Sequence, residues 1–251
     1  MHLEEFAAGV SVAHRLDPRI KLVVAIAFSF VVALSRTWPV LVTGLVLAAI
    51  LVAMAQLPLS KVIRRLAVVN TFILLLWVFL PFSQPGRELF RLGPLTASYE
   101  GVWYALAITV KSNAIILSVM ALLATSTVFT LVHALRHLYL PDKLVNMFFF
   151  TFRYFQVIHQ EYLRLRAAMR IRCFRPRTNR HTYRSVAYLM GMLLVRSFDR
   201  SDRVRQAMLC RGYNGQFWVL DHFHLHGIDY RFALTMGFLI ILMAVGEWIC
   251  L

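Results

Sequence analysis

Long apolar runs constrain this chain more than any other feature. Five runs are separated by polar stretches, at residues 22–34, 40–55, 66–82, within 101–126, and at 232–246. A transmembrane helix needs about 20 predominantly apolar residues, and the first run reaches only a marginal length even with Ile20 and Ser35. The chain has 59% hydrophobic and 16% charged residues, which is too apolar for a soluble domain. We therefore predict an all-α integral membrane protein with about five transmembrane helices.

The distribution of basic residues predicts how these helices are oriented. The amino end and the 56–65 loop are basic, whereas the 35–39 and 83–100 loops are not. Residues 127–230 contain 16 Lys and Arg against six Asp and Glu, a net charge of +10. Cytoplasmic loops collect Lys and Arg, so the amino end and this segment are expected on the cytoplasmic side of the inner (plasma) membrane. The net charge of +15 is explained by this bias and not by nucleic-acid binding.

The same pattern divides the chain into three expected parts. Residues 1–126 form an N-terminal membrane domain with about four spans, and residues 231–251 form a C-terminal transmembrane helix. Residues 127–230 form a cytoplasmic coupling domain of long amphipathic helices. Within it the apolar stretch LVNMFFFTF at 144–152 is too short to span a bilayer and is interpreted as an interfacial or buried helix turn. Lys111, inside the fourth run, must face protein or water and not lipid.

A seven-residue motif occurs twice in the basic segment. The chain reads AMRIRCF at 168–174 and AMLCRGY at 207–213, so both copies fit Ala-Met-x-x-Arg-x-aromatic. Residues 156–172 contain no Gly or Pro and favour a helix. In a helix, the Ala of each copy lies one turn before the Arg on the same face.

This arrangement suits docking into a partner's groove. A small Ala allows close approach, and Arg can make a bidentate contact with a carboxylate. The candidate docking residues are therefore Ala168 and Arg172 in the first copy and Ala207 and Arg211 in the second. Gly212 suits a helix end after the second copy, and Pro176 is expected to stop the first helix. The alternative is that these basic helices simply bind anionic lipid.

The order of several segments resembles a known family. These segments are HRLDPRIKL (14–22), ATSTVFTLVHALRHLYLPDKLV (124–145), FRYFQVIHQEYLRLRAAMRIRCF (152–174) and AMLCRGYNG (207–215). Together they resemble the T component of energy-coupling factor (ECF) transporters, and the opening LEEFAAGVSVAHRLDPR is similar to the cobalt-type branch, the CbiQ proteins.

The resemblance implies a non-catalytic scaffold in an importer of cobalt or nickel ions. Such a scaffold couples two ATP-binding cassette ATPase subunits to a separate membrane subunit that binds the substrate. It implies that Ala168 and Arg172 sit in a groove of one ATPase, and that Ala207, Arg211 and Gly212 sit in a groove of the other. ATP is then a ligand of the ATPases and not of this chain. Cys173 departs from the family pattern, which has Gly at this position, and this puts the end of the first helix in doubt.

Motifs for chemistry by the chain itself are missing from the sequence. It contains no GxxxxGK[ST], HExxH, CxxC or GxSxG, so no catalytic, cofactor-binding or metal-binding residue is assigned. One alternative function is a membrane-bound metal-binding protein or enzyme that uses His222, His224 and His226. A second is a self-sufficient secondary transporter, which should show inverted repeats in the membrane segments.

Asp17 and Pro18 precede the first apolar run and allow two interpretations. Asp and Pro are typical of the N-cap and first position of a helix. Alternatively, Asp17 and Arg19 could latch the amino end to the coupling helices.

Overall fold

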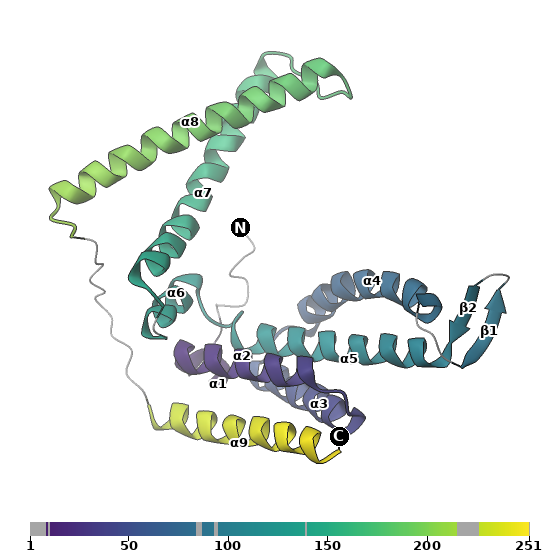
Figure 1. The fold of residues 1–251 in the computed structure, drawn as a ribbon. Helices are drawn as coiled ribbons and strands as arrows, with labels where there is room; N and C mark the ends of the chain where they lie inside the picture. Colours follow the sequence, from purple (N-terminus) through teal and green to yellow (C-terminus); the bar gives the residue numbers. More distant parts are fainter. Residues whose placement is uncertain are drawn as a thin grey trace. The chain divides into compact units, whose positions relative to one another are not determined.

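The structure is a computed structural model that describes residues 9, 11–83, 87–92, 95–138, 140–214 and 226–250, without the side chains of 12, 88–97 and 250. The chain divides into two compact units (Figure 1). The membrane unit comprises Met1–Ala134 and Phe223–Leu251, and the hairpin unit comprises Leu135–His222.

Helices dominate the membrane unit. In chain order the elements are α1 (Val12–Arg15), α2 (Pro18–Leu34), α3 (Trp38–Ala55), α4 (Leu59–Ser83), β1 (Glu88–Leu92), β2 (Leu95–Ser98), α5 (Tyr99–Leu122), α6 (Val128–His137) and α9 (Gly227–Cys250). The last residues of α6 already belong to the hairpin unit. The two strands form a small antiparallel pair between α4 and α5. The fold class predicted from the sequence, an all-α membrane protein, is confirmed apart from this short pair of strands.

Four of the predicted spans are helices long and apolar enough to cross a membrane. They are α3, α4, α5 and the Gly227–Ile249 part of α9, with mean hydropathies of 1.8 to 2.3. The first predicted span forms α2, which has 17 residues and at 1.5 Å per residue is about 26 Å long. It is therefore slightly shorter than a bilayer core of about 30 Å.

Small side chains let the membrane helices pack closely around α5. Ala48 of α3 and Ala114 and Ala121 of α5 are fully buried, together with Phe28 of α2. A Cβ atom at Gly101 would lie 2.7 Å from the backbone of Pro81, so the first turn of α5 can approach α4 only with glycine there. Close backbone approach through small residues is how helices associate in membranes, where no hydrophobic gain is available.

A buried polar cluster joins the starts of α2 and α9. Asp17 is the N-cap of α2, because its Oδ1 accepts a hydrogen bond from the Arg19 N–H at 2.8 Å. The N–H of Asp17 donates to Asp229 Oδ1 at 2.8 Å, and Lys21 Nζ donates to Ser126 Oγ at 2.9 Å. Asp17, Lys21 and Asp229 are all buried. The N-cap interpretation of Asp17 is confirmed, and the cluster also includes the segment that leads into α6.

A second cluster lies where α2 passes into α3. Glu247 of α9 accepts hydrogen bonds from the Arg36 N–H at 2.6 Å and from the Thr37 hydroxyl at 2.6 Å. Lys111 Nζ donates to the Ala33 carbonyl at 3.0 Å, near the end of α2. The lysine inside the fourth apolar run therefore contacts protein backbone. The carboxylate of Glu247 also accepts the N–H of Thr37, the N-cap residue of α3, at 3.3 Å, and this N–H has no partner within the helix.

Apart from the end of α6, the described residues of the hairpin unit form two long helices, α7 (Asp142–Ile171) and α8 (Arg180–Cys210). They run antiparallel and cross each other (Figure 1). The apolar stretch 144–152 lies within the first half of α7, so it is a part of a long helix and not an isolated turn. The helix predicted for the first motif over 156–172 is confirmed, as the second half of α7.

Candidate functional site

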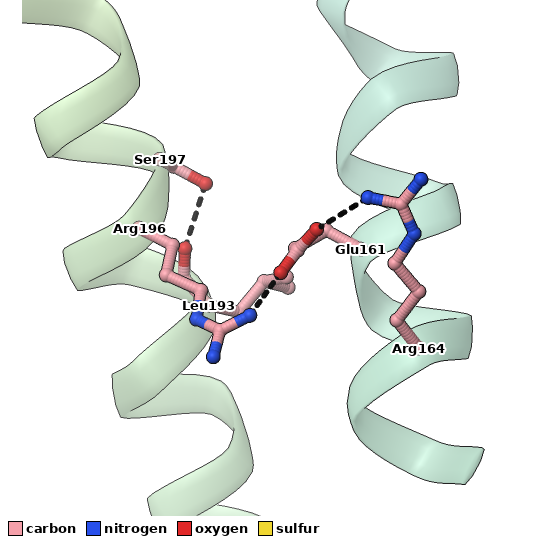
Figure 2. A network of polar contacts seen from close by, with 5 residues as sticks. All are labelled: Glu161, Arg164, Leu193, Arg196 and Ser197. Carbon is pink, nitrogen blue, oxygen red and sulfur yellow. Dashed lines mark hydrogen bonds and ion pairs between the residues drawn. The ribbon is translucent and has the colours of Figure 1, made fainter. Parts of the chain in front are cut away.

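The crossing of α7 and α8 is held by charged side chains (Figure 2). Glu161 of α7 forms an ion pair with Arg196 of α8, and Arg164 lies 3.5 Å from its second carboxylate oxygen. The hydrogen bond from Arg196 lowers the pKa of Glu161 below its usual value. The helix face that carries Glu161 and Leu165 is thus turned toward α8, and the motif residues follow on the same face at the end of α7.

The first motif copy forms the end of α7. The N–H of Cys173 donates to the Arg170 carbonyl at 3.0 Å, and the N–H of Phe174 donates to the Met169 carbonyl at 3.0 Å. These are the two hydrogen bonds of the Schellman motif, with Arg172 as the C-cap residue. The helix is stopped by this backbone motif, so the expectation that Pro176 stops it is wrong: the chain has already turned three residues earlier.

The second copy ends α8 in the same way. The N–H of Gly212 donates to the Leu209 carbonyl at 3.0 Å, and the N–H of Tyr213 donates to the Met208 carbonyl at 3.0 Å, with Arg211 as the C-cap residue. In both copies, the backbone N–H of the motif's aromatic residue donates to the backbone carbonyl of the motif's Met. An apolar contact between these two positions commonly accompanies the Schellman motif. The repeated sequence therefore encodes one helix ending twice.

Cys173 takes the backbone conformation for which glycine is usual. Its φ is 59°, and that of Gly212 at the equivalent position is 78°. A left-handed conformation costs a residue with a Cβ about 1–2 kcal/mol. The departure from the family pattern at Cys173 therefore leaves the geometry of the first helix end unchanged and is expected to lower its stability.

Replacing Cys173 by glycine is expected to stabilise the end of α7 by about 1 kcal/mol, because glycine adopts positive φ without steric cost. Cys210 provides a matched control, since it is the last residue of α8 and has helical geometry. Cys210→Gly should instead destabilise by about 0.5 kcal/mol. Amide hydrogen exchange over residues 166–174 and 205–213 measures both effects. If both substitutions stabilise, or both destabilise, their helix ends, the explanation from the backbone conformation of Cys173 is wrong.

The predicted docking residues lie on the surface of the hairpin unit. Ala168, Arg172, Ala207, Arg211 and Gly212 are all exposed. Within the described part of the chain, the guanidinium groups of Arg172 and Arg211 make no hydrogen bond or ion pair. Beyond its two chain neighbours, no described residue lies within 4 Å of a Cβ built on Gly212. Among the described residues, each helix end therefore presents an exposed alanine and an arginine whose guanidinium group makes no hydrogen bond or ion pair.

The surroundings of the two ends differ. Ala168 and Arg172 line a cavity of about 810 Å³ between the end of α7 and the start of α8. Four arginines and no Asp or Glu line it, namely Arg172, Arg175, Arg177 and Arg196. Such a surface suits an acidic partner. By contrast, a smaller groove of about 390 Å³ near the end of α8 is lined by residues that include Val204, Met208 and Tyr213. Ala207 and Arg211 are not among its lining residues.

Sequence reasoning overlooked the role of Met169, Phe174, Met208 and Tyr213. These residues stand at the two positions that the Schellman hydrogen bonds connect. The signal was present in the repeated motif, since the Met and the aromatic residue recur together with the Ala and Arg.

The histidine triplet falls mainly on residues that the structure does not describe. His222 and His224 lie outside the described residues, whereas the backbone N–H of His226 donates to Asp229 Oδ2 at 2.8 Å. A metal site at these histidines therefore stays a prediction of the alternative function.

Comparison with known proteins places the chain in a family. The family model for CbiQ, described as cobalt transport protein, matches residues 9–219. The chain belongs to the CbiQ family. The match runs from just before α1 to just beyond the end of α8, so it includes both motif copies but not α9. It confirms the resemblance seen in the sequence.

Several relatives of this CbiQ family member are named energy-coupling factor transporter transmembrane protein EcfT. The protein from Thermosediminibacter oceani is 24% identical over 225 residues, covering 84% of this chain and 83% of the relative. That from Heliobacterium modesticaldum is 25% identical over 216 residues, covering 82% and 81%. That from Acidaminococcus fermentans is 24% identical over 261 residues, covering 98% and 96%. The similarity thus covers 81% to 98% of each chain, at low identity.

Proposed function

We propose that this protein is the transmembrane T component of an ECF importer for cobalt or nickel ions. In this role it is a scaffold without catalytic activity of its own, and it couples two ATP-binding cassette ATPases to a separate substrate-binding membrane subunit. The observation that carries the proposal is the pair of helix ends at 168–174 and 207–213. They have the same backbone termination, and each exposes an Ala one turn before an Arg.

Two similar docking ends on one chain fit two similar partner subunits. The side chain of Ala168 or Ala207 adds almost no bulk, so a groove can close around the helix end. The arginine beside it can form a bidentate contact with a carboxylate, and such contacts are strong when water is excluded. ATP belongs to the partner subunits in this scheme, and this chain contributes only the docking surface.

The hairpin also provides a route for mechanical coupling. Its helices are joined at the crossing by the ion pair between Glu161 and Arg196, while their docking ends are at opposite ends of the antiparallel pair. When the two ATPases approach each other on binding ATP, both ends are displaced, and the crossing makes the two helices move together. In this proposal the protein lies in the plasma membrane. The loop charges support a position of the hairpin unit and the amino end on its cytoplasmic side.

Reconstitution tests this function directly. The chain is co-expressed with two ATP-binding cassette ATPases and a cobalt-binding membrane subunit, and the purified complex is placed in proteoliposomes. We expect ATP-dependent uptake of radiolabelled cobalt that disappears when this chain is omitted. Uptake should persist when His222, His224 and His226 are all replaced by Ala. Loss of uptake in that variant, with normal assembly, would favour the metal-binding alternative.

A further inference from the structure

We propose that a pocket at the α2–α3 turn binds the phosphate headgroup of an anionic phospholipid. The pocket has a volume of about 640 Å³ and lies within the membrane unit, where α3 and α5 begin. Cationic and aromatic side chains dominate its lining: Arg36, Arg87, Lys111, Trp38, Trp103 and Tyr104. This inference does not depend on the proposed transport function.

Aromatic rings form one side of the pocket. Trp38 and Trp103 meet edge to face with their ring centroids 4.7 Å apart, and Tyr99 contacts Trp103 at 5.9 Å. Tyr99, Trp103 and Tyr104 remain between 41% and 57% exposed. Trp38 and Tyr99 are also the first residues of two helices that can span a membrane. Trp and Tyr at the ends of spans mark the level of lipid headgroups.

The pocket has many more hydrogen-bond donors than acceptors. In the part of the chain that the structure describes, the guanidinium groups of Arg36 and Arg87 have no acceptor, and neither do the indole N–H groups of Trp38 and Trp103. Lys111 uses one of its three donors on the Ala33 carbonyl.

Among the lining residues, the single carboxylate is that of Glu100, whose Oε2 already accepts the backbone N–H of Arg87 at 2.7 Å. A ligand that matches this set must bring oxygen acceptors and negative charge, as a phosphate group does.

The position of the pocket decides between a lipid and a soluble anion. A free phosphate would use the cations but would leave the exposed rings of Trp103 and Tyr104 in contact with water. A phospholipid uses both features, because its phosphate meets the arginines while its glycerol and acyl groups cover the rings. Its headgroup would also link Arg36, in the α2–α3 turn, to Arg87, which directly precedes β1.

Native mass spectrometry of the purified protein tests the proposal. Protein from membranes that contain phosphatidylglycerol should retain one such lipid after mild detergent washing. Arg36→Gln combined with Arg87→Gln should lower the affinity at least about tenfold, because both charge-assisted contacts to phosphate are lost. The matched control is Arg64→Gln with Arg65→Gln, an equal charge change on exposed residues near the start of α4, which should retain the lipid.

Two further arms identify the ligand. Phosphatidylcholine vesicles should not supply the retained lipid, and inorganic phosphate at millimolar concentration should not displace phosphatidylglycerol. Arg36→Lys with Arg87→Lys keeps the positive charges and should keep most of the binding, which separates loss of the site from misfolding. Equal retention by the Gln pair and its control would overturn the proposal. Full displacement by inorganic phosphate would also overturn it, in favour of a soluble anion.

Discussion

Ala207→Glu is expected to abolish co-purification of the ATPases and ATP-driven uptake, while the chain still inserts in the membrane. The substitution places a bulky carboxylate on the small-residue face of the α8 end, and a closed groove would have to desolvate that charge. Arg211→Ala removes a charge-assisted contact and should cost about 2–4 kcal/mol of binding, about 30- to 1,000-fold in affinity. Pull-down of the ATPases measures both losses.

Matched controls separate docking from a general effect of charge. Gln206→Glu adds the same carboxylate at the neighbouring exposed position of α8, and Arg203→Ala removes an exposed arginine two turns before Arg211. Both controls should retain ATPase binding. Because Cys173 gives the α7 end the same geometry as the α8 end, Arg172→Ala should be about as harmful as Arg211→Ala. Wild-type binding by the double variant of Arg172 and Arg211 would show that the motifs do not dock, and lipid binding by the basic helices would take their place.

Lys21→Met should destabilise the membrane unit by about 1–3 kcal/mol, the usual cost of leaving buried polar groups without their partner. Lys21 is only 1% exposed, and the carboxylates of Asp17 and Asp229 both attract its ammonium group. Without Lys21, two buried carboxylates lose their compensating charge. Chemical unfolding in detergent, followed by tryptophan fluorescence, gives the change in the free energy of unfolding.

Two variants make this measurement specific. Lys143→Met removes an exposed lysine from α7 and should change stability by less than about 0.5 kcal/mol. Adding Asp229→Asn to Lys21→Met should restore part of the loss, because the amide oxygen can still accept the N–H of Asp17 while one negative charge disappears. If Lys21→Met is as stable as Lys143→Met, the cluster contributes nothing to the fold.

Apolar runs predicted the membrane helices well, because a helix in lipid must satisfy its backbone internally and cover itself with apolar side chains. The cluster of Asp17, Lys21 and Asp229 was beyond such reasoning. Its central hydrogen bond joins residues 212 positions apart, and no local pattern reports which distant carboxylate reaches a given N–H. Asp17 was recognised as an N-cap because capping depends only on its immediate neighbours.

At the candidate docking ends, too, some features could be predicted from the sequence and others could not. The repeated Ala and Arg positions could be read from the sequence, and so could the helix around them. Pro176 was given the role of helix stop because proline is the strongest local signal, whereas the hydrogen bonds at Cys173 and Phe174 end the helix first. A cysteine with positive φ is rare enough that the sequence favoured the wrong explanation.

Two carboxylates of α9 hold the two ends of α2 at a fixed separation. Asp229 and Glu247 are 18 residues apart, which is five full helical turns and about 27 Å on one face of the helix. One accepts the backbone N–H of Asp17 just before α2, and the other accepts the backbone N–H of Arg36 just after it. The two helices therefore run parallel and are fastened at both ends, so neither can slide along the other. A bilayer thicker than this pair is expected to thin around it, since neither helix can slide along the other to extend the pair.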